Sequence, residues 1–212
     1  MDTEPSQQAL KTRLRKEIRQ KRAAIDPARR SGWDMCINQN LENYTREMTP
    51  RVVAAYMAFD GEPDLLPALT RLGREGVKLA LPVIQDVPGK AIITMKAWSP
   101  DMELAANRYG IAEPDGTEDV RIADIDLVLV PLVGWDRTGG RLGMGASFYD
   151  RLFQPFAGLE KPLRIGVAYE LQRLSSVPRD PWDIRLHGVL TENGWFTCEG
   201  AGATMGLRGS KK

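Results

Sequence analysis

The stretch IDLVLVP, residues 125–131, decides the fold. It is apolar on both of the faces that alternate residues present, which is typical of a central strand in a parallel sheet. Other apolar stretches predict strands around it. They are RVVAAYMA (51–58), VKLALPVI (77–84), AIITMKAW (91–98), LRIGVAY (163–169) and HGVLTENGWF (187–196), the last strand containing an Asn-Gly turn.

Helical patterns alternate with these strands. Ser6 is a candidate cap for a first helix, whose apolar residues recur at helical spacing up to Ile25. Asp26 followed by Pro27 predicts the start of a second helix, which runs to about Met48. Further helices are predicted at 64–73, at 103–110, where a glycine closes the helix, and at 146–156.

This alternation, with short connections, predicts an α/β fold. We expect a single domain over residues 1–200, built as an open, mostly parallel sheet with helices on both faces. The Gly-rich and basic residues 201–212 are predicted to form a disordered tail.

Composition narrows the function classes. The 212 residues are 42% hydrophobic and 27% charged, with a formal net charge of +1, which favours neither nucleic acid nor a membrane as partner. No apolar run approaches the roughly 20 residues that span a bilayer, and the polar N-terminus lacks a secretion signal, so we expect a cytoplasmic monomer. Cys36 and Cys198 are predicted to be two unpaired thiols. His187 is the only histidine, which excludes a histidine-rich metal site.

The glycine-rich stretch GGRLGMGASFYDR, residues 139–151, follows the central strand, at the sheet edge where α/β proteins bind ligands. A dinucleotide-binding loop starting at Gly143 would need a glycine where Phe148 stands, and a Walker loop would need a lysine where Ala146 stands. Backbone N–H groups that lead into a helix nevertheless favour an anion, with Arg141 as a source of positive charge. The alternative is a mobile surface loop.

The same stretch resembles the signature of the 5-formyltetrahydrofolate cyclo-ligase family, D-x-x-G-x-R-L-G-x-G-x-G-[FY]-Y-D-R. The matching residues are Asp136, Gly139, Arg141 (with Gly140 at the variable position before it), Leu142, Gly143, Gly145, Phe148, Tyr149, Asp150 and Arg151. Weaker matches follow in family order: Lys11, Leu14 and Arg15; Tyr56 and Glu62; Gly110, Ile111, Glu113 and Pro114; Trp182, Asp183, Val189, Leu190 and Thr191. Two positions depart from the pattern: Ser147 replaces a glycine, and His187 replaces an aspartate.

The resemblance implies an enzyme that acts on small molecules. It would convert 5-formyltetrahydrofolate to 5,10-methenyltetrahydrofolate, with ATP as co-substrate and Mg²⁺ as cofactor, releasing ADP and phosphate. The formyl oxygen is a poor leaving group, so its phosphorylation would let N10 close the ring, and the protein would mainly position the reactants and stabilise charge.

The resemblance also implies residue roles. Arg141 and Tyr149 would be catalytic, and Asp150 and Asp183 would hold the metal. The ATP-binding residues would be Lys11, Arg15, Arg141, Leu142, Gly143, Met144, Gly145, Ala146, Ser147, Phe148 and Tyr149. The folate-binding residues would be Tyr56, Met57, Glu62 and Tyr149. Arg141 is expected to face solvent, so that its removal leaves the melting temperature unchanged.

Each role has a simpler alternative. Lys11 and Arg15 belong to a basic segment, 11–30, that is consistent with a solvated helix face, while Asp183 and Glu62 are also ordinary turn residues. Two other functions remain open. One is RNA binding through segment 11–30, and the other is a catalytically inactive relative that binds a phosphate ligand, suggested by Ser147.

Overall fold

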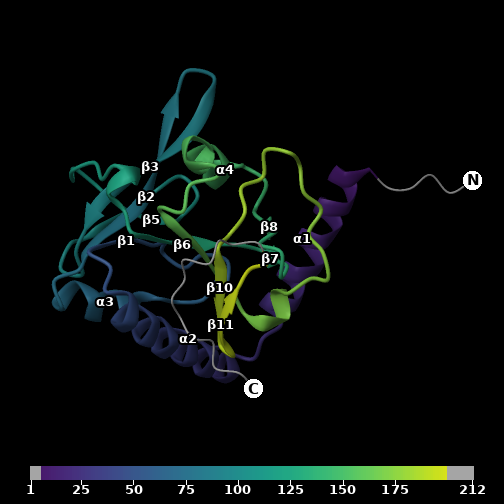
Figure 1. The fold of residues 1–212 in the computed structure, drawn as a ribbon, viewed down its shortest axis with the longest axis horizontal. Helices are drawn as coiled ribbons and strands as arrows, with labels where there is room; N and C mark the ends of the chain where they lie inside the picture. Colours follow the sequence, from purple (N-terminus) through teal and green to yellow (C-terminus); the bar gives the residue numbers. More distant parts are fainter. Residues whose placement is uncertain (1–5, 200–212) are drawn as a thin grey trace, which may run out of the picture.

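The computed structural model describes residues 6–199 (Figure 1). Its core is a seven-stranded sheet in the order β11-β10-β9-β6-β1-β2-β3. The inner pairs from β10 to β2 are parallel, and the edge strands β3 and β11 pair antiparallel. The strands are β1 (Val52–Ala54), β2 (Lys78–Val87), β3 (Lys90–Trp98), β6 (Leu127–Pro131), β9 (Leu163–Val167), β10 (Gly188–Thr191) and β11 (Gly194–Thr197).

The stretch quoted first supplies the central strand. β6 pairs with β1 on one side and β9 on the other, and Leu127 and Val128 are fully buried although they point to opposite faces. Successive strand residues alternate between the two faces, so a strand apolar throughout is covered on both. The predicted α/β class, with a single domain and a mostly parallel sheet, is confirmed.

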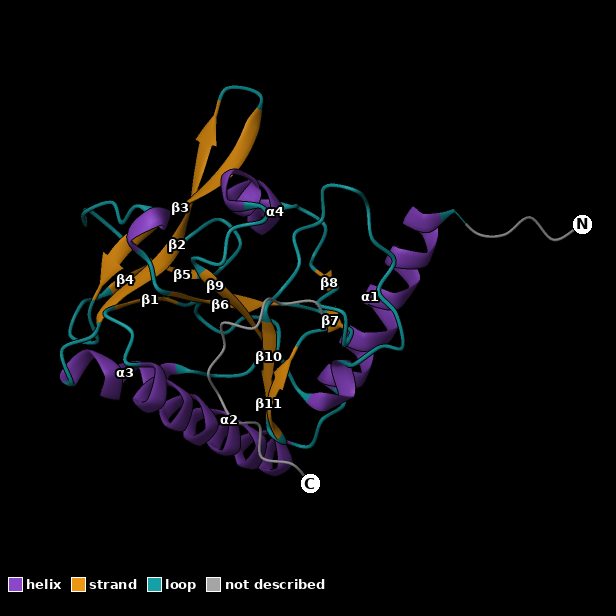
Figure 2. Ribbon diagram, viewed as in Figure 1, coloured by secondary structure: helices purple, strands orange, loops and turns teal. Residues whose placement is uncertain are grey.

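Helices cover both faces (Figure 2). α2 (Pro27–Met48) and α3 (Leu66–Arg74) pack against one face, and α4 (Phe148–Phe153) packs Phe153 against the other. α1 (Gln7–Ala23) packs Ile18 and Leu14 against Val133 and Leu142, beyond the end of β6. The caps are those that the sequence predicts: the Ser6 side chain accepts a hydrogen bond from Ala9 N, and Asp26 from Ala28 N and Arg29 N. Short 3₁₀ turns complete the chain at η1 (Ile122–Asp124), η2 (Gln154–Phe156) and η3 (Glu170–Gln172).

The predicted helix at 103–110 is wrong. This segment begins with a short strand, β4 (Leu104–Ala106), that pairs antiparallel with β5 (Ala112–Pro114). The carbonyl oxygen of the Asn107 side chain accepts hydrogen bonds from Tyr109 N and Ile111 N, and Gly110 has φ +78°. The asparagine therefore stabilises a turn in place of the helix, by bonding the backbone ahead of it.

The last predicted strand is a hairpin. Its turn at residues 192–193 separates β10 from β11, Gly194 has φ +118°, and Asn193 N donates to Thr191 Oγ1. The predicted tail, 201–212, lies outside the described residues. Within residues 6–199, the helices are too short or too polar to cross a membrane.

Candidate active site

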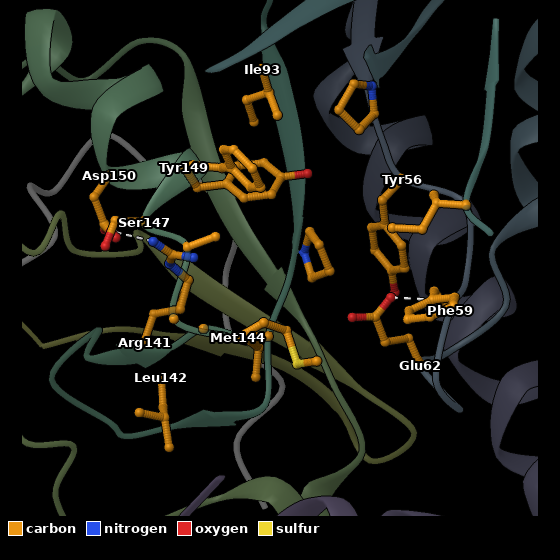
Figure 3. A pocket seen from close by; sticks show the side chains of 18 of the residues that line it. Tyr56, Phe59, Glu62, Ile93, Arg141, Leu142, Met144, Ser147, Tyr149 and Asp150 are labelled. Carbon is orange, nitrogen blue, oxygen red and sulfur yellow. Dashed lines mark hydrogen bonds and ion pairs between the residues drawn. The ribbon is translucent and has the colours of Figure 1, made fainter. Parts of the chain in front are cut away.

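A cavity of about 440 Å³ lies beyond the carboxyl ends of β1 and β6. Every residue that the sequence predicts for catalysis, nucleotide, folate or metal lines it. Figure 3 shows some of them, with Arg141, Tyr149 and Asp150 on one side and Tyr56 and Glu62 on the other. They come from four places: Lys11 and Arg15 on α1; Tyr56, Met57 and Glu62 after β1; the continuous segment 141–150; and Asp183 before β10. The topology thus brings together segments that are far apart in the sequence.

Lys11 stands at the cationic end of the cavity, between two carboxylates. Its Nζ lies 2.7 Å from Asp180 Oδ2 and 2.9 Å from Asp183 Oδ2, and the residue is only 6% exposed. Burial acts to lower the pKa of Lys11, but the hydrogen bonds and charges of the two aspartates outweigh it, so the pKa is raised. Lys11 is therefore an inward-facing cation, which does not fit the alternative of a solvated helix face.

Arg15 and Arg141 complete this end. Arg15 Nε donates to the carbonyl of Gly143, which ties α1 to the glycine loop. Arg141 Nη2 lies 2.6 Å from Asp150 Oδ1, and the guanidinium lies over the ring of Tyr149 at 5.6 Å. The expectation that Arg141 faces solvent is wrong: its side chain is 6% exposed, because it is enclosed between its ion-pair partner and an aromatic ring.

The glycines of the loop divide into two kinds. A Cβ on Gly139 would lie 2.6 Å from the carbonyl oxygen of Leu186, and one on Gly140 would lie 2.5 Å from Asp136 Oδ2. Gly139 thus allows close packing onto Leu186, and Gly140 allows it onto Asp136, a buried carboxylate that accepts hydrogen bonds from Gly140 N and from Val177 N. The first part of the loop is thus packed closely against its own chain.

The other two glycines, Gly143 and Gly145, line the cavity itself. Gly145 has φ +106°, a conformation that favours glycine. Ser147, which stands where the family has a glycine, is also in the left-handed region with φ 51°, immediately before α4. The serine therefore holds a backbone conformation that costs a residue with a Cβ more than it costs glycine.

The proposed metal ligands face the same end. Asp150 and Asp183 each pair with a cation, and Ile184 N donates to Asp150 Oδ1 at 3.3 Å, which brings the two segments together. Within residues 6–199 no group of three or more acidic, histidine or cysteine side chains is arranged to hold a metal. Two carboxylates fit Mg²⁺ where nucleotide phosphates and water supply the remaining ligands, which is its usual manner of binding.

The opposite end of the cavity is apolar, with a few polar groups. Tyr56 is buried and its hydroxyl donates to the carbonyl of Pro63, so its ring serves as wall. Within residues 6–199, the buried Tyr149 hydroxyl has no hydrogen-bond partner. Burial raises the pKa of Glu62 to about 7, although Arg22 acts against that rise. A free hydroxyl and a carboxyl that changes charge near neutral pH are groups suited to a polar ligand.

Several lining residues were missed from the sequence. Ile84 of β2 and Ile93 of β3 form the apolar wall, and Glu113 of β5 accepts hydrogen bonds from Ile84 N and from the Asn107 side chain. The alternation of apolar residues along β2 and β3 carries a signal for a buried face, but not for a cavity. Asp180, the second partner of Lys11, has no local signal.

The lone histidine and the cysteines take no part in the cavity. His187 Nδ1 accepts a hydrogen bond from Arg164 N, and burial lowers the pKa of His187 to about 4. It is therefore neutral and packed, as expected for a residue without a metal role. Cys36 and Cys198 are both free, as predicted.

The fold and the cavity define the class of this protein. An α/β sheet with a cavity at the carboxyl ends of its strands, lined by paired charges at one end and by apolar residues at the other, is the architecture of an enzyme that acts on small molecules. Residues 7–192 match the model of the 5-formyltetrahydrofolate cyclo-ligase family, and the chain belongs to that family.

Individual relatives agree. The chain is 32% identical over 176 residues to the 5-formyltetrahydrofolate cyclo-ligase of Escherichia coli K12, which covers 82% of this chain and 96% of that protein. It is 29% identical over 192 residues to the Haemophilus influenzae protein of the same name, covering 90% and 99%. The solved structure of Aquifex aeolicus 5,10-methenyltetrahydrofolate synthetase superposes with a TM-score of 0.76 at 31% identity, covering 96% of this chain and all of that one. The protein is thus a ligase of folate metabolism.

Proposed function

We propose that this protein converts 5-formyltetrahydrofolate and ATP to 5,10-methenyltetrahydrofolate, ADP and phosphate, with Mg²⁺ as cofactor. One observation carries the proposal: the cavity has two unlike ends that meet at Tyr149. Three cations, Lys11, Arg15 and Arg141, surround one end, and apolar walls with Glu62 form the other. Such a division suits two substrates, one a polyanion and the other a flat heterocycle.

The proposed reaction has two chemical steps, phosphorylation of the formyl oxygen and then ring closure. The formyl oxygen attacks the γ-phosphorus, and ADP leaves. N10 then attacks the formyl carbon, phosphate departs with the former formyl oxygen, and N10 loses its proton. Because phosphate is a good leaving group where the amide-like oxygen is not, the protein needs to position the reactants and stabilise charge rather than form a covalent bond to either.

The phosphates belong at the cationic end. Arg141 and Lys11 would contact the transferring phosphoryl group, and the backbone N–H groups of 143–147 would hold the remaining oxygens. Asp150 and Asp183 would hold Mg²⁺, which neutralises phosphate charge when it is bound. Since both carboxylates are paired with cations in the structure, nucleotide and metal would enter by exchanging these partners.

The folate belongs at the apolar end. Ile84 and Ile93 offer a flat wall to the pterin, and the Glu62 carboxylate suits its N–H donors. The unpartnered Tyr149 hydroxyl lies between the two ends, so it would donate to the formyl or phosphoryl oxygen as charge develops there. An aromatic ring at this point also excludes water from the reacting atoms.

The rival RNA-binding reading would depend on exposed cations of α1 such as Arg13, Lys16 and Lys21. Lys11, Arg15, Arg19 and Arg22 make their hydrogen bonds to this chain's own groups. A helix that bound RNA through phosphates would need such cations free on its outer face. The expectation of a cytoplasmic monomer rests on composition alone.

The deciding experiment is a direct cyclisation assay on the purified protein. Forming the conjugated N5=C–N10 cation creates new near-ultraviolet absorbance, which should appear only when protein, 5-formyltetrahydrofolate and Mg-ATP are all present. Phosphate release should match product one for one. If ATP binds but no absorbance develops and no phosphate is released, the protein is the inactive relative and the proposal is wrong.

A further inference from the structure

The loop that carries Glu62, residues 59–62, is held from outside the cavity by α1. Asp60 Oδ2 accepts a hydrogen bond from Arg19 Nε at 2.7 Å and another from Arg22 Nη2 at 2.9 Å. Asp60 lies in the left-handed region with φ 52°, and its side chain contacts the helix. Arg19, Arg22 and Asp60 do not line the cavity. Phe59 and Glu62, which flank Asp60 and Gly61 in the loop, both line it.

Arg22 is an unusual residue within this contact, because it is completely buried. Besides Asp60, its guanidinium donates to the carbonyl of Leu132 at 3.4 Å, directly after β6. Its Nε is buried and has no hydrogen-bond partner among the residues that the structure describes. A buried arginine is costly unless its charge is compensated, so a residue with this much desolvation is expected to be coupled to nearby acids.

The second acid is Glu62. The positive charge of Arg22 favours its ionised form, while burial and the negative charge of Asp60 act against it. The other titratable groups that face Glu62 are Tyr56, at the end of β1, and Tyr149 of α4. Glu62 also accepts a hydrogen bond from Phe59 N, so its carboxylate is tied to the same loop that Asp60 anchors.

A third arginine closes the arrangement. Arg30 Nη2 of α2 donates to the backbone carbonyl of Arg22, and the Arg30 guanidinium lies about 3.4 Å from where a Cβ on Gly61 would stand. The loop is therefore enclosed by two helices, and Gly61 has φ +75°, a conformation that favours glycine.

We propose that Arg22 and Asp60 are positioning residues, which hold the 59–62 loop against α1 and thereby set the place and the charge of Glu62 at the folate end of the cavity. The inference rests on the proposed function, since it takes the folate as the ligand of Glu62. The inference assigns the two ends of α1 to different substrates. The N-terminal half contacts the nucleotide through Lys11 and Arg15, and the C-terminal end positions the folate-binding loop through Arg22.

The test compares kinetic constants for the two substrates in three variants, Asp60→Asn, Arg22→Met and Arg22→Lys. Asn at position 60 keeps the left-handed conformation and removes only the charge. Asp60→Asn and Arg22→Met should each raise the KM for 5-formyltetrahydrofolate by about tenfold or more, the loss expected for a mispositioned charged contact, and leave the KM for ATP nearly unchanged. Arg13→Gln, on the outward face of the same helix, is the matched control and should change neither constant.

The pH dependence of kcat/KM for the folate distinguishes a positioning role from a merely structural one, because loss of a merely structural residue does not change it. Binding through ionised Glu62 makes kcat/KM for the folate fall as pH falls through the pKa of that carboxyl. Arg22→Met removes a positive charge near it, so this acidic limb should shift to higher pH. Arg22→Lys keeps the charge and should leave the limb near its wild-type position, although an ammonium lacks the fork that contacts both Asp60 and the carbonyl of Leu132.

The outcomes separate the two proposals. If Arg22→Met does not fold, Asp60→Asn, on a partly exposed side chain, decides the question alone. A variant that melts earlier but keeps the wild-type folate KM and pH limb overturns the inference and leaves the proposed function intact. If the wild-type protein does not cyclise the folate, the proposed function fails. Calorimetric titration with 5-formyltetrahydrofolate then tests the inference by binding alone, and equal affinities in wild type and Asp60→Asn overturn it.

Discussion

The ammonium of Lys11 lies 2.9 Å from the carboxylate of Asp183. The cation assigned to nucleotide phosphate is thus ion-paired with an oxygen ligand assigned to Mg²⁺, across 172 residues of sequence. Both side chains are largely buried, so each is desolvated already and would exchange one charged partner for another as Mg-ATP binds. An exchange of partners costs less than stripping two solvated charges of water.

Lys11→Gln should raise the KM for ATP about tenfold or more and lower the free energy of unfolding by about 1–3 kcal/mol, because Asp180 and Asp183 lose their common partner. Steady-state kinetics and urea denaturation measure the two effects. Lys16→Gln, exposed on the same helix, should change neither. An unchanged KM for ATP would show that Lys11 is a structural lysine only.

Turnover should require Mg²⁺ and disappear with excess chelator. Asp150→Asn and Asp183→Asn should each reduce activity far more than they reduce the melting temperature, since the amide keeps the shape of the side chain and weakens its affinity for the metal. Asp101→Asn, at an exposed position outside the cavity, serves as the control. Full activity in chelator would refute the metal assignment.

Arg141→Ala should lower kcat by about 10²–10³-fold, the usual effect of removing one preorganised donor to developing charge. It should also lower the melting temperature, because Asp150 would be left largely buried without its partner. Arg141→Lys should restore only part of the activity, as an ammonium lacks the forked geometry. Near wild-type turnover in Arg141→Ala would mean that the glycine loop does not bind the transferring phosphate.

Ser147→Gly should leave activity intact and raise the free energy of unfolding by up to about 1 kcal/mol. Relief of the left-handed strain at φ 51° is opposed by the greater chain entropy of glycine in the unfolded state. Ser147→Ala keeps the Cβ and should show no gain, which separates the backbone effect from loss of the hydroxyl. Equal stabilisation by both variants would contradict the strain argument.

Glu62→Gln should stabilise the protein increasingly as pH rises. With a pKa of about 7 when folded and its ordinary, lower value when unfolded, Glu62 binds more protons in the folded state between these values. Ionised Glu62 destabilises the folded protein, so this effect is absent at acidic pH and complete above pH 7. The difference in unfolding free energy between variant and wild type should grow by about 1–3 kcal/mol between pH 4.5 and 8. A difference that is flat with pH contradicts the raised pKa. His187 titrates in both proteins, so its contribution cancels in the difference between their unfolding free energies.

The regular parts of the fold were predictable where local pattern and tertiary environment agree. The apolar run of 125–131 lies in the middle of the sheet, so its burial on both faces can be predicted from its apolar composition. In the segment 103–110 the local sequence pattern and the observed structure disagree. A single side chain, Asn107, bonds the backbone into a turn, and helical spacing does not reveal that competition.

The sequence by itself determined the fold class, the family and the segments of the cavity that match the family signature, because a glycine-rich loop after a buried strand and that signature are local patterns. Only the tertiary structure decided how these residues are paired. Asp180 meets Lys11, and Arg22 meets Asp60, because the sheet topology brings distant segments to one edge. In sequence, Arg22 is one more basic residue in a basic helix, beside Lys21, which is exposed. Burial separates the two, and burial depends on what packs against each position rather than on the residue itself.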